Sequence, residues 1–428
     1  MKYFFSFLVI TFFSVSLFGQ TTKEELFDNL NKTGGSYYTY PVNDIRPKTP
    51  APSGYEPFYI SHFGRHGSRY LINDSDYKDA LDILQNAKES KALTSLGLDV
   101  YNRLTKVWEE AEGRGGDLAP LGVKQHRGIA ERMFMAYPEI FKENVRISAR
   151  STIVIRCILS MSAFCERLKE LNPGLQLSLD ASNKYMPYLN HQTKEAMKFR
   201  SDKDVWAKYN EFEKEHIQPQ RLIRSLFSDT SYVAKNIKQD AFMWSLYWIA
   251  SDMQDIETPV SFYDIFTKEE LFNLWQCNNY KWYVGYANAA ENGGIMMDNA
   301  KPVLRNIIHT ADTIIENHSK GATLRFGHDV NIVPLAMLLH FQDCYASISN
   351  PADYYKAWSD FKVTPMGANI QLIFFRKSDN PQDVIVKFLL NENEMLIPPV
   401  QSDIKPYYHW KDVRDYYESL LTGKPAEK

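Results

Sequence analysis

The chain has 428 residues, which is too long for one small domain and suits one large two-part domain or two domains. Hydrophobic residues make up 44% of the chain and aromatic residues 14%, which is ample for a buried core. The formal net charge of −3 argues against a nucleic-acid-binding protein, which needs a broad basic surface, so any basic patch must be local.

The first 19 residues are predicted to be a secretory signal peptide. Lys2 supplies a positive end, residues 3–18 are an almost uninterrupted apolar run, and Gly19-Gln20 is a plausible cleavage point. An uncleaved membrane anchor is the alternative, but the run is short for a membrane span. No later segment is long and apolar enough to span a membrane. We therefore expect an exported protein, periplasmic, secreted or on the cell surface, with no stable membrane span after signal cleavage.

The four cysteines do not form a Cys-x-x-Cys motif or a histidine-rich cluster, so no structural metal is predicted. Cys157 and Cys165 lie in one predicted helix, about 12 Å apart at 1.5 Å per residue, which is too far for a disulfide. The other cysteine pairings stay open. An exported protein with few cysteines is typical of a bacterial periplasm or cell surface.

A polar segment over residues 21–56 is predicted to form a helix and then an extended stretch over the surface. It is followed by a strand over residues 58–63, where apolar and aromatic residues alternate. Directly after this strand comes Arg65-His66-Gly67-Ser68-Arg69, which sets two guanidinium groups around an imidazole. Two fixed cations beside a histidine suit a doubly charged anion such as a phosphate monoester. Ligands of open α/β sheets bind at this edge.

A solvated basic turn with an incidental histidine is the simpler interpretation of this motif. Arginines normally spread along a surface rather than bracket a histidine at a strand end, so we favour the anion site. Helices are then predicted over residues 76–90, 98–111 and 118–135. The glycine run at residues 113–116 lacks a following Lys-Ser/Thr and does not follow a strand, so it is predicted to be a connector.

A second cationic position follows the short strand predicted over residues 145–148. Ser151 or Thr152 can cap the helix predicted over residues 153–171. Arg156 stands in the apolar first turn of that helix, where a charge needs an anionic partner or an exit to water. A structural salt bridge is one explanation for Arg156, and Arg150 is an alternative anion ligand.

Residues 172–299 differ in character, because helical periodicity dominates after a short strand predicted over residues 175–179. We interpret them as an α-helical cap inserted into an α/β core formed by residues 20–171 and 300–428. Aromatic residues are frequent in the cap, and most of them are expected in its core; examples are Trp206, Trp244, Tyr247, Trp248 and Trp275. Cap helices are predicted over residues 193–214, 221–228, 231–254, 268–277 and 280–288, and residues 300–316 form a helix that returns to the core.

The third candidate segment is a strand over residues 322–326 that ends at Gly327-His328-Asp329. A helix over residues 330–340 follows, with Pro334 in its first turn. His328 and Asp329 therefore lie at a helix N-terminus, where backbone amides and the helix dipole favour an anion, although Asp329 can simply cap the helix. Two more strands, over residues 370–375 and 384–389, flank a turn at residues 378–381, and a helix over residues 408–421 closes the chain.

Three segments in this order resemble the signatures of the histidine phosphatase superfamily, in its acid phosphatase and phytase branch. They are Arg65-His66-Gly67-Ser68-Arg69, the Arg150-Ser151-Thr152 segment with Arg156, and Gly327-His328-Asp329. Residues 118–126 are similar to a further family element, with Ala119 where threonine is usual, and are expected to support the fold rather than catalysis. The resemblance implies an α/β fold with a central, mainly parallel sheet flanked by helices, and a site between this core and the inserted cap.

The same resemblance implies the chemistry of the site. His66 is the expected nucleophile, and Asp329 is the expected proton donor to the leaving oxygen. Arg65, Arg69, Arg156 and His328 are the expected phosphate ligands, and four cationic partners remove the need for a metal or another cofactor. The expected partner is a small phosphate monoester, with no nucleic acid, and the oligomeric state stays open.

Within this branch, residues 63–70 and 325–328 look most like the inositol polyphosphate phosphatases, such as the bacterial multiple inositol polyphosphate phosphatases. Those proteins typically carry His-Ala-Glu, whereas this chain has His328-Asp329, the form found in general acid phosphatases. We therefore expect hydrolysis of inositol polyphosphates such as phytate, with broad activity on phosphate monoesters as the alternative. Additional phosphates would need cations on the cap, and the candidates, each of which is otherwise part of a solvated helix face, are Lys194, Lys198, Arg200 and Lys203.

Two functions of other classes are alternatives to this one. A phosphomutase shares the first motif, but the export signal and the large helical insertion argue against it. A non-catalytic phosphate- or glycan-binding surface protein could keep the fold, but it is expected to lose His66 or Asp329, and both are present.

Overall fold

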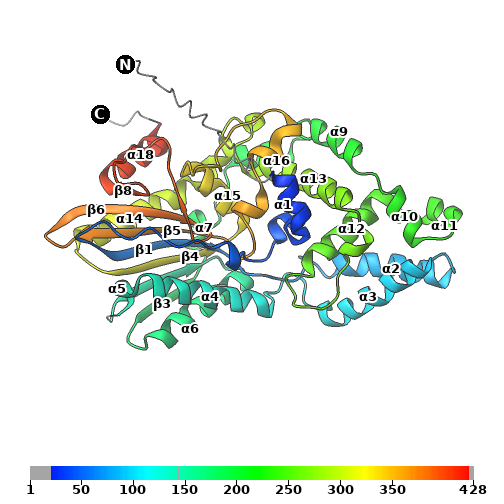
Figure 1. Ribbon diagram of the computed structural model, residues 1–428, viewed down its shortest axis with the longest axis horizontal. Coiled ribbons are helices and arrows are strands. Elements are labelled where there is room, and N and C mark those ends of the chain that lie inside the picture. Colours follow the sequence, from blue (N-terminus) through cyan, green and yellow to red (C-terminus); the bar gives the residue numbers. More distant parts are fainter. Residues whose placement is uncertain (1–20, 143, 424–428) are drawn as a thin grey trace, which may run out of the picture.

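The strands among the described residues form one mixed sheet at one end of an elongated molecule (Figure 1). The computed structural model describes residues 21–142 and 144–423, so the predicted signal peptide lies outside the described residues. Within them, no helix has the length and apolar character needed to cross a bilayer. The strands are β1 (Tyr55–Arg65), β2 (Arg146–Ser151), β3 (Gln176–Ala181), β4 (Gly321–Gly327), β5 (Asn369–Lys377), β6 (Asn380–Leu390), β7 (Asn393–Met395) and β8 (Tyr407–His409).

The sheet has a parallel half and an antiparallel half that meet at β1. Its strand order in the described residues is β3-β2-β4-β1-β5-β6-β7, and β8 pairs with β6. The strands β3, β2, β4 and β1 run parallel to one another, whereas β5, β6, β7 and β8 pair in antiparallel fashion. The expected α/β fold is confirmed, and its parallel strands end together at one edge of the sheet.

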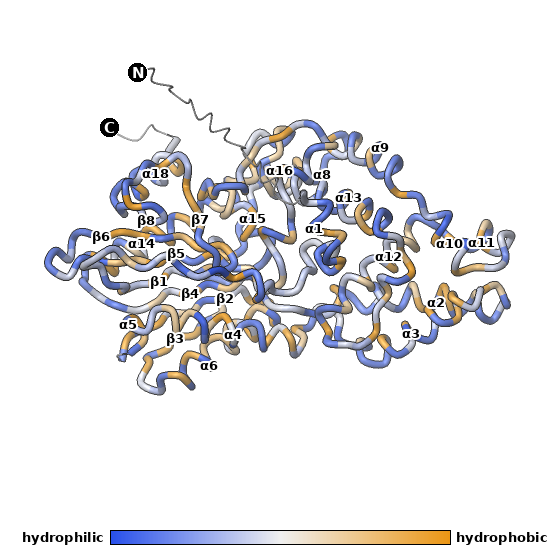
Figure 2. The backbone as a smooth tube through the Cα atoms, in the orientation of Figure 1, coloured by the Kyte–Doolittle hydropathy of each residue, from blue (hydrophilic) through white to orange (hydrophobic). Residues whose placement is uncertain are grey.

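Helices cover both faces of the sheet, so its central strands are buried on both sides. Consecutive side chains of β1 point to opposite faces: Tyr59 and Phe63 pack into one core cluster, and Ile60 packs into another. Figure 2 shows hydrophobic stretches along the strands and on turns of the flanking helices, while many outer loops are hydrophilic. One face is covered by α4 (Pro120–Ala136), α5 (Pro138–Phe141) and α6 (Ile155–Leu171), and the other by α14 (Lys301–Glu316), α15 (Asp329–Leu338) and α18 (Trp410–Thr422).

The opposite end of the molecule is a helical region (Figure 1). It contains α2 (Ser75–Glu89) and α3 (Ser95–Ala111), which come before the expected cap in the sequence. These two helices pack against residues 220–226 and 239–252 of the expected cap. The other helices of the region are α8 (Lys194–Ser201), α9 (Ala207–His216), α10 (Gln220–Leu226), α11 (Thr230–Asn236), α12 (Gln239–Asp252) and α13 (Lys268–Tyr286).

The helical region is therefore built from two stretches of sequence rather than from one insertion. The expected boundary at residue 172 also falls before β3, which pairs with β2 and belongs to the sheet. Strand pairing, which a linear sequence does not display, places β3 with the core. The N-terminal segment is a helix, α1 (Thr22–Asp28), followed by a 3-10 helix, η1 (Leu30–Tyr37), so it is less extended than expected.

Two expected cap helices are each divided in two, and two expected helices are one. Residues 193–214 form α8 and α9, and residues 231–254 form α11 and α12. In contrast, α13 continues through Asn278 and Asn279, which lie between the two helices predicted over residues 268–277 and 280–288. Both amides are buried, and they bond Asp360 and the Trp358 carbonyl, so tertiary hydrogen bonds hold the asparagines inside the helix.

The structure also tests the predictions about the position of Pro334 in its helix and about the pairing of the cysteines. Because α15 begins at Asp329, Pro334 is its sixth residue and lies beyond the first turn where we expected it. All four cysteines are buried and unpaired, so Cys157 and Cys165 do not form a disulfide.

Candidate active site

The candidate site lies where β1 and β4 end beside each other. The parallel register sets Arg65 opposite Gly327, and the His66 N–H donates to the Gly327 carbonyl at 3.1 Å. The Gly67 N–H donates to Ser160 Oγ of α6 at 3.1 Å. The first motif, the helix that carries Arg156 and the Gly327 turn therefore meet at one edge of the sheet, as the sequence predicted.

The start of α4 supports the loop that carries His66. Gly67 and Gly122 approach so closely that a Cβ on Gly67 would lie 2.6 Å from the Gly122 Cα. The Gln125 side chain accepts from the Ser68 N–H at 2.8 Å and donates to Ser68 Oγ at 2.7 Å. The Ala119 N–H donates to the Ser68 carbonyl at 2.9 Å, a backbone contact that does not need a hydroxyl at position 119. The element over residues 118–126 thus has the supporting part predicted for it.

His66 is buried and neutral, with one ring nitrogen free to react. Its Nδ1 lies 2.9 Å from the Gly67 carbonyl oxygen. Since a carbonyl can only accept, Nδ1 carries the proton and Nε2 keeps its lone pair. Burial holds the pKa of His66 well below its usual range, and four nearby groups lower it further. Those groups are the predicted phosphate ligands, Arg65, Arg156, Arg69 and His328.

Arg65 links the strand end to Asp329. The Arg65 guanidinium is fully buried and lies 2.8 Å from Asp329 Oδ2. It also donates to the Ser36 carbonyl at 2.5 Å and to the Thr364 carbonyl at 2.7 Å. Its Nε has no partner among the described residues, which leaves a donor for a ligand.

Asp329 is ionised in the free protein. Burial raises the pKa of its carboxyl, but the charge of Arg65 and, after it, the neighbouring His328 and Arg69 more than offset this and hold the pKa below its usual range. Its Oδ1 accepts the N–H of Val330 at 2.8 Å in the first turn of α15, whose N-cap residue is His328. The expectation that Asp329 caps the helix is therefore not met, and its bond to the Val330 N–H is compatible with a position beside His66.

Arg69 is held from two sides. It donates to the Tyr70 carbonyl at 2.8 Å and to the Tyr37 hydroxyl at 3.1 Å, and its guanidinium lies 4.7 Å from the centre of the Tyr37 ring. Its Nε is buried without a partner among the described residues. Tyr37, at the end of η1, thus fixes a predicted phosphate ligand, although nothing in its local sequence indicated that.

The structure places Arg156, not Arg150, beside His66. Arg150 donates to the Ser178 carbonyl at 2.8 Å and lies 5.3 Å from the Tyr185 ring centre, which keeps it at the sheet edge strand. Arg156 makes no ion pair or hydrogen bond with the described residues, and its Nε is buried. The salt-bridge explanation for Arg156 therefore does not hold, and an unpaired guanidinium is available for an anion.

His328 stands edge-on to His66, with ring centres 5.8 Å apart. Its Nε2 lies 3.3 Å from Thr152 Oγ1, which belongs to the second motif. Burial lowers the pKa of His328 to about 4, with Asp329 opposing this shift and Arg156 adding to it. His328 is therefore neutral at neutral pH, and the expected ring of four cations consists of three guanidiniums and one uncharged imidazole.

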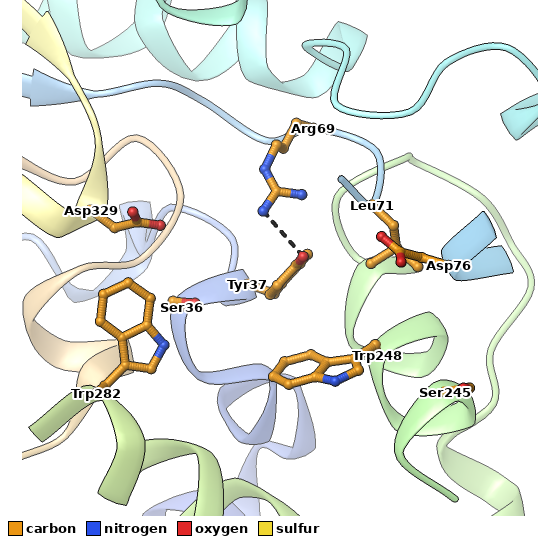
Figure 3. Close-up of a pocket in the computed structure, with 9 residues that line it drawn as sticks. All are labelled: Ser36, Tyr37, Arg69, Leu71, Asp76, Ser245, Trp248, Trp282 and Asp329. Atoms are coloured by element: carbon orange, nitrogen blue, oxygen red, sulfur yellow. Dashed lines mark hydrogen bonds between the residues drawn. The ribbon is translucent and has the colours of Figure 1, made fainter. Parts of the chain in front are cut away.

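A cavity of about 360 Å³ opens beside Arg69 and Asp329 (Figure 3). Its walls come from η1, the loop after β1, and helices α2, α12, α13 and α15. Trp248 packs against the main core cluster and also lines this cavity. The described residues around it are Ser36, Tyr37, Arg69, Leu71, Asp76, Ser245, Trp248, Trp282 and Asp329.

None of the four predicted cap cations lines this cavity. Lys194, Lys198 and Lys203 are exposed on or near α8. Arg200 lies over the Tyr286 ring, 4.6 Å from its centre, and bonds Gln192. The solvated-face explanation fits the three lysines, and the cavity walls were missed because their residues are scattered singly along the chain.

Comparison with known proteins supports the family resemblance seen in the sequence. The family profile for the histidine phosphatase superfamily (branch 2) matches residues 63–391. Multiple inositol polyphosphate phosphatase 1 of Gallus gallus is 22% identical over 393 residues, covering 86% of this chain and 83% of its own. The structure of Bifidobacterium longum multiple inositol polyphosphate phosphatase with phosphate has a TM-score of 0.73 at 19% identity, covering 93% of this chain and 100% of that one.

A phytase from D. castellii has a TM-score of 0.63 at 15% identity, covering 93% of this chain and 88% of the phytase. These neighbours share the fold described above. The profile match takes in the whole set of groups around His66, from Arg65 to Asp329. The chain therefore belongs to the histidine phosphatase superfamily, branch 2.

Proposed function

We propose that the protein is a phosphomonoesterase that transfers the phosphoryl group of its substrate first to His66 and then to water. The observation that carries this proposal is a buried, neutral imidazole with a free Nε2 lone pair, beside three guanidiniums and one carboxylate. A neutral imidazole is a nucleophile, whereas its protonated form is not. Since burial lowers the pKa of His66, the nucleophile stays active at mildly acidic pH.

In the first step, His66 Nε2 attacks phosphorus, a P–N bond forms, and the bond from phosphorus to the ester oxygen breaks. Arg65, Arg69 and Arg156 hold the non-bridging oxygens, over which negative charge is spread in the transition state. His328 contributes hydrogen bonding rather than charge. Asp329 gives its proton to the leaving oxygen, so the alcohol departs neutral.

Asp329 must gain a proton before it can act as an acid, because it is ionised in the free protein. A bound phosphate dianion competes for Arg65, the partner that contributes most to lowering the pKa of Asp329. The added negative charge also raises that pKa. Substrate binding therefore prepares the acid, and the ion pair between Arg65 and Asp329 keeps it ionised until then.

In the second step, water attacks phosphorus and the P–N bond breaks, with its electron pair returning to His66 Nε2. Asp329, ionised after the first step, accepts the proton from the water. Inorganic phosphate leaves, Asp329 releases this proton to the solvent, and the site returns to its resting state. The three guanidiniums neutralise the charge of the phosphoryl group in both steps.

Inositol polyphosphates such as phytate are the proposed substrates. Support comes from the relatives, which include multiple inositol polyphosphate phosphatases and phytases, with one structure holding inositol hexasulfate. Broad activity on phosphate monoesters is the second candidate, favoured by the His328-Asp329 pair and by the cavity that the predicted cap lysines do not line. Export to the periplasm or cell surface is proposed from the apolar N-terminal run alone.

Phosphate release from phytate and from 4-nitrophenyl phosphate tests the function and separates the two candidates. We expect kcat/KM to be higher for phytate or a lower inositol phosphate than for the aryl ester. Brief reaction with radiolabelled substrate, followed by denaturation, should leave acid-labile label on the protein. A protein that turns over substrate without such label would use another mechanism, and one that only binds phosphate would be a binding protein.

A further inference from the structure

The cavity of Figure 3 is the space that the alcohol part of a bound ester must enter. Arg69, a proposed phosphate ligand, and Asp329, the proposed proton donor, both line it. The ester oxygen lies between the phosphorus and the alcohol, so the group beyond that oxygen continues into the same cavity. Its volume of about 360 Å³ is within the range of small-molecule sites.

Two indole rings form one side of this cavity. Trp248 of α12 and Trp282 of α13 lie below Arg69 and Tyr37 in Figure 3. Trp248 is fixed against Tyr37, with ring centres 5.6 Å apart, and Trp282 against Tyr286, at 4.9 Å. Aromatic faces suit the C–H face of a polyol ring, and they offer no positive charge for a phosphate group.

The far side of the cavity carries a carboxylate. Figure 3 shows Asp76 of α2 across the cavity from Asp329, with Arg69 and Tyr37 between them. Asp76 accepts the Asn73 N–H at 2.9 Å and takes part in none of the ion pairs among the described residues. A carboxylate accepts hydrogen bonds from hydroxyl groups and repels phosphate groups.

The remaining polar groups of the cavity do not reverse this preference for hydroxyl groups over phosphate groups. Ser245 donates its own hydroxyl proton to the Ala241 carbonyl at 3.1 Å, so its oxygen is left to accept from a ligand. Among the described residues that line the cavity, Arg69 alone is cationic, and the proposed reaction already uses it. A ligand with phosphates on several sides would meet acceptors and indoles rather than cations.

We propose that Asp76 makes this cavity selective for a polyol ring that presents hydroxyl groups to it, so that partially phosphorylated inositols are preferred to the hexakisphosphate. The inference rests on the proposed function and narrows its substrate class. The phosphate to be cleaved lies on His66, the ring lies along Trp248 and Trp282, and free hydroxyls face Asp76 and Ser245.

The test is binding without turnover, in a His66→Ala background with and without Asp76→Asn. Titration calorimetry would measure the dissociation constants of myo-inositol monophosphate and myo-inositol hexakisphosphate. Removing one negative charge a few ångströms from a phosphate should tighten hexakisphosphate binding by about threefold to tenfold. Monophosphate binding should stay unchanged or weaken slightly, and the effect on the hexakisphosphate should shrink as salt is raised.

Asp79→Asn is the matched control, because Asp79 is exposed on the same helix and does not line the cavity. An unchanged ratio of the two dissociation constants in Asp76→Asn would overturn the proposal, as would an equal change in Asp79→Asn. If the ratio shifts as expected but the wild-type protein releases no phosphate from any ester, the selectivity stands and the proposed function fails.

Discussion

The sheet edge around His66 and the helical wall of the cavity differ in how their side chains are held. At the sheet edge, Arg65, His66 and Arg69 are each at most 4% exposed, and each has a backbone carbonyl as a partner. At the helical wall, Asp76, Trp248 and Trp282 are only half-buried. Hydrogen bonds to backbone carbonyls hold the side chains at the sheet edge in the one arrangement that the reaction needs. The half-buried side chains on the helices can be replaced without changing that arrangement. Changes at the sheet edge should therefore affect all substrates, and changes at the helical wall should affect the choice among them.

The largest effect is expected from His66→Ala, which removes the nucleophile. Turnover of every phosphate ester should fall by at least about 10⁴-fold, because a covalent step has no substitute. The measurement is kcat for phytate and 4-nitrophenyl phosphate, with the circular dichroism spectrum to show that the fold is intact. His309→Ala, on the exposed face of α14, is the control and should be fully active. Appreciable activity in His66→Ala would refute the phosphohistidine route. It would also refute the expectation that changes at the sheet edge affect all substrates.

Asp329→Asn should lower kcat by about 10²-fold to 10⁴-fold for alkyl phosphates such as inositol phosphates, the usual contribution of general acid catalysis. The loss should be far smaller for 4-nitrophenyl phosphate, whose leaving group needs little protonation. Asparagine can still accept the Val330 N–H, so the first turn of α15 keeps this hydrogen bond. Equal losses for both esters would count against Asp329 as the proton donor, and Asp412→Asn in the first turn of α18 serves as the control.

Arg156 and Arg65 differ within the phosphate site, because Arg65 forms a buried ion pair and Arg156 is unpaired among the described residues. Arg156→Gln should raise KM and the inhibition constant of inorganic phosphate by about tenfold to a hundredfold, the value of one charge-assisted hydrogen bond. Its stability should change by less than about 0.5 kcal/mol, since Arg156 is partly exposed and unpaired among the described residues.

Arg65→Gln should weaken phosphate binding and also destabilise the fold by about 3 kcal/mol, because it breaks a buried ion pair. Urea unfolding measures both variants against the wild type. Similar stability losses in Arg65→Gln and Arg156→Gln would show that Arg156 has a structural partner after all.

The smallest effect concerns two histidines buried behind the sheet edge. Burial lowers the pKa of His62 to about 3, with His126 and Arg325 adding to the shift, and burial lowers the pKa of His126 to about 4. Their unfolded pKa is near 6.5, so below that pH the unfolded chain binds protons that the folded protein does not. Each histidine should therefore reduce the free energy of unfolding by about 1.4 kcal/mol per pH unit as the pH falls from 6.5 to 4.

His62→Leu removes one of these titrations. Both ring nitrogens of His62 lack partners in the described structure, and its ring lies against Phe164 and Phe326, so an apolar side chain suits the site. Urea unfolding between pH 7 and 4.5 should show a slope that is shallower by about 1.4 kcal/mol per pH unit, with activity at pH 7 kept. An unaltered slope would place the acid sensitivity elsewhere, and the exposed His309→Leu is the reference.

The sheet edge could be predicted because its features are local. Alternating apolar and aromatic residues indicate the buried strand, and Arg65-His66-Gly67-Ser68-Arg69 directly after them shows which side chains lie at its end. The same holds for β4 and Gly327-His328-Asp329. The division of helices was less predictable, since buried hydrogen bonds keep Asn278 inside α13, and no local pattern shows that.

The amino-acid sequence by itself determined the chemistry of this protein: a histidine, three arginines and an aspartate, each at the end of a strand or the start of a helix. The hydrophobic period and the polarity of a segment depend on neighbouring residues, so both can be predicted from the linear sequence. The tertiary structure decided which arginine faces His66, that His328 is uncharged, and that Tyr37, Asp76, Trp248 and Trp282 enclose one cavity. Burial and proximity between distant segments produce these features, and both exist only once the chain has packed.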